Sequence, residues 1–216
     1  MSNSKNIESG LIWITGFSAS GKTTVARKTN ILLKENGYQT IFLDGDDLRR
    51  VFSEHWGHDL SSRSDLAKVY FHLCSHLSSQ GYLVIISAIA MFNEIGLWVK
   101  DNIQNSMQIY LKVPKNERRI RDEKTKKIFV DKELNDDYYD APINADLIID
   151  NYGKTTPDIA ANQILSFYSN IKKSYLDRGR DLYWQKYYEK GFAPHEPTPF
   201  AKFDFISTNA ILSSYL

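Results

Sequence analysis

The residues from Gly16 to Thr23 have the types and the spacing to bind phosphate. They read Gly-Phe-Ser-Ala-Ser-Gly-Lys-Thr and match the pattern G-x-x-x-x-G-K-[ST]. An apolar run at residues 11–15 precedes them and a segment with helical spacing at residues 22–35 follows, which favours a phosphate-binding loop over a plain glycine-rich turn. Such a loop presents backbone N–H groups and the positive end of a helix dipole to a triphosphate.

Individual positions of this loop carry predicted roles. The ammonium group of Lys22 would stabilise the phosphate charge, and the hydroxyl of Thr23 is placed to ligate Mg²⁺. The residues expected to bind the triphosphate are Gly16, Ser18, Ala19, Ser20, Gly21, Lys22, Thr23 and Thr24.

A group of carboxylates and an arginine follows the second apolar run, residues 40–44. It reads Leu43-Asp44-Gly45-Asp46-Asp47-Leu48-Arg49. Phosphoryl transfer to a hydroxyl needs one carboxylate to accept or orient the proton and one to hold Mg²⁺, and an arginine can fix an anionic acceptor. The alternative is a solvated acidic turn in which Asp46 or Asp47 caps the next helix. The phosphate-binding loop upstream favours the catalytic interpretation.

The elements that must position these residues alternate along the chain. Short apolar runs predict strands at residues 11–15, 40–44, 82–87, 107–113 and 147–150. Helical patterns occur at 22–35, 46–53, 65–79, 93–102 and 115–122, and Thr156-Pro157 opens a long helix toward residue 175. This alternation predicts an α/β fold of the P-loop NTPase type, with a parallel sheet flanked by helices and ligands beyond the carboxyl ends of the strands.

Composition narrows the class of protein further. The chain has 216 residues, 42% of them hydrophobic, and a net charge of +1, so nothing in its charge favours nucleic-acid binding. Its single cysteine, Cys74, excludes an intramolecular disulfide and is expected to be a buried structural thiol in a reducing compartment. No signal peptide and no apolar run of about 18 residues is visible, so we expect a cytoplasmic protein without a membrane span.

The composition changes near the C-terminus, which predicts one domain at residues 1–176 and an extension at 177–216. The extension is rich in aromatic residues and has prolines at 194, 197 and 199. So many aromatic residues are too apolar for a free disordered tail. We expect the extension to pack on its own domain or on a twin subunit, or to link to a further domain.

Together with two later segments, these motifs resemble the adenylyl-sulfate kinase (APS kinase) family. The segments are Arg121-Asp122-Glu123-Lys124 and Ala141-Pro142-Ile143-Asn144-Ala145-Asp146-Leu147, which are similar to the family's Arg-Asp-Pro-Lys and Ala-Pro-Glu-Asn-Pro-Asp-Leu. The resemblance covers about residues 10–172. It implies an enzyme that binds ATP and Mg²⁺ and phosphorylates the ribose 3′-hydroxyl of a nucleotide, and it implies a homodimer, since family members are commonly dimeric.

The resemblance also assigns roles by position. It implies that Lys22 and Thr23 hold the phosphates and the metal, that Asp46 receives the hydroxyl proton, and that Asp44 orients the waters of Mg²⁺. The roles of the two aspartates could be exchanged. The remaining assignments are acceptor contacts at Arg49, Lys68, Ala88 and Ile89, an ATP contact at Arg121, and an acceptor contact near the ATP at Lys124.

The departures from the family lie on the acceptor side. The family's Asn-Ile-Arg-Arg run is replaced by Ala67-Lys68-Val69-Tyr70, so that Lys68 or Arg63 would have to replace a lost arginine. The family's Phe-Ile-Ser-Pro is replaced by Ala88-Ile89-Ala90-Met91, which reduces an aromatic wall to alanine. The connection between residues 124 and 141 is shorter than in the family.

Several functions therefore stay open. The acceptor is adenylyl sulfate or a related nucleotide. A branch similar at Met91-Phe92-Asn93-Glu94-Ile95, associated with surface-polysaccharide clusters, includes cytidine diphosphoramidate kinase. A nucleotide-binding regulatory module and a kinase for another small metabolite, such as a sugar, are the further alternatives.

Overall fold

The computed structural model describes residues 9–52, 56–57, 59–124, 136, 139–142 and 144–171. The chain forms two compact units, residues 1–165 and 166–216, and the described part of the second unit is limited to 166–171. The predicted boundary at residue 176 and the predicted extension lie outside the described residues.

Five parallel strands form one sheet in the first unit, in the order β2-β3-β1-β4-β5. Their bounds are β1 (Gly10–Thr15), β2 (Thr40–Asp44), β3 (Leu83–Ser87), β4 (Ser106–Lys112) and β5 (Leu147–Asp150). Each strand lies within one residue of its predicted bounds, and the predicted parallel α/β fold is confirmed. The register pairs Asp44 with Ser87, so the carboxyl ends of β2 and β3 meet beside the loop that follows β1.

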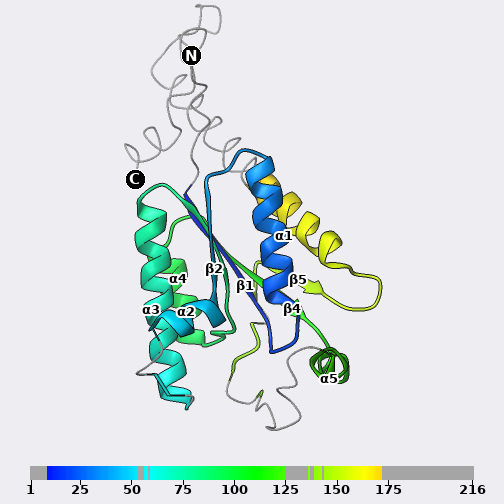
Figure 1. The fold of residues 1–216 in the computed structure, drawn as a ribbon. Helices are drawn as coiled ribbons and strands as arrows, with labels where there is room; N and C mark the ends of the chain where they lie inside the picture. The colour runs from blue at the N-terminus through cyan, green and yellow to red at the C-terminus, as the bar shows by residue number, and fades with distance from the viewer. Residues whose placement is uncertain are drawn as a thin grey trace, which may run out of the picture. The chain divides into compact units, whose positions relative to one another are not determined.

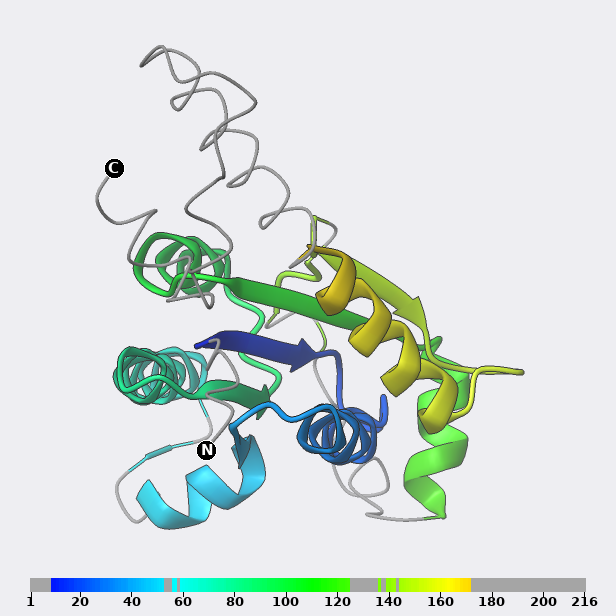
Figure 2. The same ribbon diagram turned by 90° about the horizontal axis from the view of Figure 1, so that it is seen from above.

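The helices cover both faces of this sheet. They are α1 (Lys22–Glu35), α2 (Gly45–Phe52), α3 (Leu60–Ser79), α4 (Asn93–Asn102) and α5 (Lys115–Glu123). In Figures 1 and 2, α3 and α4 lie on one face of the sheet and α1 lies on the other. This arrangement explains why β1 and β3 are continuous apolar runs that are buried along their whole length.

The core between the sheet and the α3–α4 layer is built around Trp13. Its ring packs edge-on against Phe71 of α3, with 4.6 Å between ring centroids, and its indole N–H donates to the carbonyl of Ala88 at 3.2 Å. Cys74 is fully buried in the same core, and burial raises the pKa of its thiol to about 12. The prediction of a buried structural thiol is confirmed.

Two helix starts illustrate where local sequence signals succeed and fail. Thr156 was expected as an N-cap, and its hydroxyl accepts from the backbone N–H of Ile159 at 3.2 Å; the helix that follows is described as far as residue 171. The prediction that the third helix starts at residue 65 is wrong, because Asp59 caps it and accepts from the backbone N–H of Ser62 at 3.0 Å. Within the described ranges, no helix has the length and apolar character needed to span a membrane.

Candidate active site

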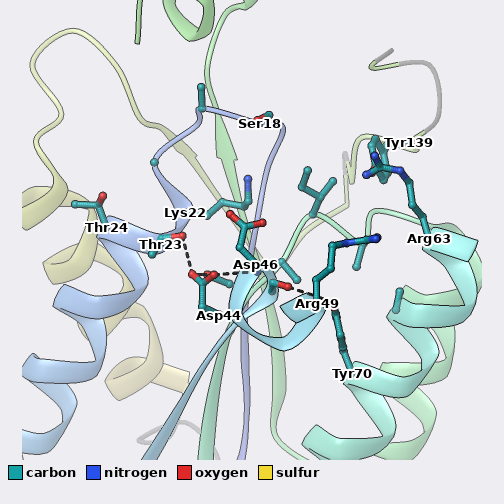
Figure 3. A pocket seen from close by; sticks show the side chains of 18 of the residues that line it. Ser18, Lys22, Thr23, Thr24, Asp44, Asp46, Arg49, Arg63, Tyr70 and Tyr139 are labelled. Atoms are coloured by element: carbon teal, nitrogen blue, oxygen red, sulfur yellow. Dashed lines mark hydrogen bonds between the residues drawn. The ribbon is translucent and has the colours of Figure 1, made fainter. Parts of the chain in front are cut away.

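A cavity of about 580 Å³ opens at the carboxyl ends of the strands. Figure 3 shows it from close by. It is lined by the loop before α1, the start of α2, one side of α3 and the segment after β3, with further contributions from Arg121, Tyr139, Asn151 and Thr155. Its position beyond the strand ends is the one predicted from the sequence.

The loop between β1 and α1 has the backbone of an anion-binding nest. Positive φ angles occur at Gly16 (148°), Ala19 (59°) and Gly21 (89°), as in loops whose backbone N–H groups bind anions. Gly16 is sterically required, because a Cβ there would lie 2.7 Å from the carbonyl oxygen of Leu111. The amino group of Lys22 donates to the carbonyl of Phe17 at 2.9 Å and so lies over its own loop.

Asn151 supports this loop from the end of β5, and the sequence analysis missed it. Its side-chain amide donates to the carbonyl of Ser20 at 2.7 Å, and Arg121 donates to the backbone carbonyl of Asn151 at 2.7 Å. Asn151 is almost fully buried. The signal that could have found it is its position directly after a strand whose carboxyl end faces the ligand side of the sheet.

Asp44 is a buried carboxylate held by several donors. It accepts hydrogen bonds from the hydroxyls of Thr23 at 2.7 Å and Ser87 at 2.8 Å, and from the backbone N–H of Asp46 at 2.9 Å. Burial raises the pKa of Asp44, but these hydrogen bonds outweigh it and the net pKa lies below the ordinary value. Asp44 is therefore ionised at neutral pH.

Asp46 and Arg49 bring opposite charges into the cavity from the first turns of α2. Residues three apart on a helix share one face, and both side chains line the cavity. In Figure 3 the carboxylate of Asp46 and the amino group of Lys22 point toward one another. Arg49 donates to the carbonyl of Gly57 at 3.2 Å, and Tyr70 beside it donates to the carbonyl of Gly45 at 3.1 Å.

The other end of the cavity combines small, aromatic and basic side chains. The guanidinium of Arg63 donates to the hydroxyl of Tyr139 at 2.8 Å, and the rings of Tyr139 and Phe92 lie 5.4 Å apart. Alanines at 67, 88 and 90 also line the cavity there. This end is therefore spacious and carries cationic groups suited to an anionic ligand.

The cavity brings together most of the predicted site residues: Ser18, Ala19, Gly21, Lys22, Thr23, Thr24, Asp44, Asp46, Arg49, Ala88, Ile89 and Arg121. Gly16 and Ser20 are buried in the loop itself and do not line the cavity. Lys124 is exposed at the end of α5.

The predicted acceptor contact at Lys68 is not part of the cavity. Lys68 is exposed and forms ion pairs with Asp65 at 3.2 Å and Glu94 at 3.7 Å. Of the two residues suggested to replace the missing arginine, only Arg63 lines the cavity. The reason is helical geometry, because Lys68 lies on α3 at an angle that turns it toward α4 instead.

Comparisons with known proteins identify similar sequences. The family model for adenylylsulphate kinase matches residues 8–150. The chain is 36% identical over 149 residues to the cytidine diphosphoramidate kinase of Campylobacter jejuni, covering 65% of this chain and 85% of that protein. It is 28% identical over 165 residues to the adenylyl-sulfate kinase of Pseudomonas aeruginosa, covering 73% and 84% of the two proteins.

A solved structure shows the same fold. The APS kinase of Mycobacterium tuberculosis in complex with AMPPNP and APS aligns with a TM-score of 0.66 and 23% identity, covering 75% of this chain and 98% of that one. Sugar-type kinases share the fold more distantly, as in the gluconokinase of Sinorhizobium meliloti, with a TM-score of 0.59 and 15% identity over 79% of this chain and 98% of that one.

Proposed function

This chain belongs to the adenylyl-sulfate kinase family of phosphotransferases, and we propose that it transfers the γ-phosphoryl group of ATP to the ribose 3′-hydroxyl of a nucleotide. One observation carries the proposal: a single cavity joins the phosphate-binding loop to Asp46 and Arg49. A carboxylate between a triphosphate site and a cationic acceptor site is the arrangement that phosphoryl transfer to a hydroxyl requires.

The triphosphate end suits ATP with Mg²⁺. The backbone nest and Lys22 would hold the phosphates, and Lys22 would stabilise the charge that develops on the transferred group. The hydroxyl of Thr23 and the ionised carboxylate of Asp44, 2.7 Å apart, form a hard oxygen donor pair that fits a hydrated Mg²⁺. When bound, Mg²⁺ would neutralise phosphate charge at this position.

The acceptor hydroxyl would attack the γ-phosphorus in line with the bond to the β–γ bridging oxygen. The new phosphorus–oxygen bond forms as the bond to the bridging oxygen breaks, ADP leaves, and the hydroxyl proton passes to the carboxylate of Asp46. Asp44 suits the proton-accepting role less well, because its hydrogen-bond donors lower its pKa and make it a weaker base. These contacts support Asp46 as the base and Asp44 as the group that holds Mg²⁺.

Two acceptors deserve direct comparison, cytidine diphosphoramidate and adenylyl sulfate. Arg49 and Arg63 both line the cavity and would bind the anionic part of either nucleotide. Identity to the Campylobacter jejuni cytidine diphosphoramidate kinase favours the cytidine nucleotide. We therefore propose cytidine diphosphoramidate as the first acceptor and adenylyl sulfate as the second.

The test is acceptor-dependent release of ADP from Mg²⁺-ATP by the purified protein. Asp46→Asn should lower kcat by about 10²–10⁴-fold while the Kd for ATP stays the same, because the variant loses only the base. Asp47→Asn is the matched control, since Asp47 lies next to Asp46 but faces Arg50 at the surface. Binding of ATP without transfer to either acceptor would instead support the regulatory-module alternative.

A further inference from the structure

Hydrogen bonds and a ring contact connect residues 139–140 to the segment between β3 and α4. The backbone N–H of Asp140 donates to the carbonyl of Met91 at 2.8 Å, and the Asp140 carboxylate accepts from the backbone N–H of Asn93 at 3.2 Å. The ring of Tyr139 packs against Phe92 at a tilt of 42°. The Tyr139 hydroxyl is therefore held at a defined place on the wall of the cavity.

Arg63 reaches this hydroxyl from α3, and Figure 3 shows the two side chains next to each other. Arg63 lies in the N-terminal part of α3. Its guanidinium donates to the Tyr139 hydroxyl at 2.8 Å (Figure 3). The two helices behind the pair are also joined, because the hydroxyl of Ser64 on α3 donates to Glu94 on α4 at 2.6 Å. Arg63 therefore lies on α3, Tyr139 contacts the segment before α4, and these two helices contact each other.

We propose that Tyr139 is a positioning residue, which holds the Arg63 guanidinium in the acceptor end of the cavity for the anionic phosphate group of the nucleotide acceptor. The inference rests on the proposed function, because it concerns the acceptor subsite of the same cavity. The sequence analysis did not predict this contact between Arg63 and Tyr139.

The chemistry of the pair suits this role. Arginine has a long side chain that loses conformational entropy when it binds a ligand, and a partner that orders it beforehand lowers that cost. A phenol hydroxyl is neutral, so it orders the guanidinium without cancelling its charge.

The ligand expected at this position is a nucleotide that carries negative charge near its 5′-phosphate. Arg49 lines the same cavity and adds a second cation. Cytidine diphosphoramidate and adenylyl sulfate both satisfy this description, so the positioning role is independent of which of the two is the acceptor.

The experiment compares Tyr139→Phe with the wild-type protein, with cytidine diphosphoramidate and adenylyl sulfate as probes. Removing one hydrogen bond should raise the KM for the acceptor by about 2- to 10-fold and leave kcat and the KM for ATP unchanged. In an Arg63→Met background, Tyr139→Phe should add no further change. Tyr152→Phe is the matched control, because Tyr152 is partly exposed and does not line the cavity.

The following outcomes would overturn the proposal. One is an active wild-type protein whose acceptor KM is unaffected by Tyr139→Phe. Another is an equal effect in the Arg63→Met background, which would mean that Tyr139 contacts the acceptor directly. If the wild-type protein transfers phosphate to neither probe, the proposed function fails separately. In that case the Kd of each probe is measured for the wild-type protein and for Tyr139→Phe. Equal Kd values for the two proteins, or no binding to the wild-type protein, would overturn the proposal.

Discussion

The two ends of the cavity are assembled in different ways. The triphosphate end comes mainly from one continuous stretch, residues 16–24, with Asp44 packed behind Thr23. The acceptor end combines Arg63 of α3, Phe92 after β3 and Tyr139 before β5. A continuous stretch keeps its geometry when distant residues change, so the acceptor end can vary while the transfer machinery is retained.

Two arginines show the same contrast at the level of single side chains. Arg118 is 2% exposed, donates to both carboxylate oxygens of Asp136 and lies 4.8 Å from the ring centroid of Phe17. Its charge is balanced by a carboxylate, which suits a structural contact behind the phosphate-binding loop. Arg63 lines the cavity and donates to the neutral hydroxyl of Tyr139, which suits a contact with an anionic acceptor.

Removal of the cation at the triphosphate end should have a large effect that separates the two ends. Lys22→Met should lower kcat by about 10²–10³-fold, because a charge-stabilising donor is lost from the transition state. The Kd of the acceptor should change little. Lys28→Met on the same helix is the control, since Lys28 forms an ion pair with Asp158 at the surface. A matching loss of acceptor affinity in Lys22→Met would mean that the two ends are not independent.

A variant at the acceptor end should instead change the KM for the acceptor. Arg49→Ala should raise the KM for the acceptor by about 10- to 100-fold, because a hydrogen bond to a charged group is lost, and should leave the KM for ATP unchanged. Arg50→Ala is the matched control, since Arg50 is its neighbour on α2 and pairs with Asp47 at the surface. Steady-state kinetics with each substrate varied in turn makes the distinction, and a change confined to the KM for ATP would contradict it.

The lowered pKa of Asp44 predicts a smaller effect, on stability rather than on acceptor binding. In the unfolded chain Asp44 binds a proton near its ordinary pKa of 3.8, whereas the folded protein binds it at lower pH. The stabilisation is therefore present above about pH 5 and is lost as the pH falls through the folded pKa. Urea unfolding between pH 2.5 and 7 should show a weaker pH dependence for Asp44→Asn than for wild type. Asp101→Asn, on the exposed side of α4, should follow wild type.

The sequence predicted the elements of the first unit and most of the triphosphate end because both depend on local patterns. Apolar runs mark β1 and β3, and the glycine loop lies between a strand and a helix. The Arg63–Tyr139 contact could not be predicted, because it joins residues 76 positions apart in the chain. The structural role of Asn151 was missed for the same reason, since its amide reaches the carbonyl of Ser20 from 131 positions further along the chain.

Lys68 is a predicted acceptor contact that the structure places outside the cavity. It therefore tests how far the acceptor end extends. Its hydrogen bond to Asp65 and the nearby charge of Glu94 raise the pKa of Lys68, and both partners lie outside the cavity. Lys68→Ala should therefore leave the KM for the acceptor within about twofold of wild type, as expected for an exposed ion pair. Arg63→Met, five residues earlier on α3, should raise it.

Measuring both variants in one assay locates the edge of the acceptor end. An increased acceptor KM in Lys68→Ala would mean that Lys68 leaves Glu94 when the nucleotide binds, and that the acceptor end extends a further turn along α3. An unchanged KM would restrict the cationic contacts on α3 to Arg63. That result would leave Arg63, which donates to Tyr139, as the cation through which this helix binds the acceptor.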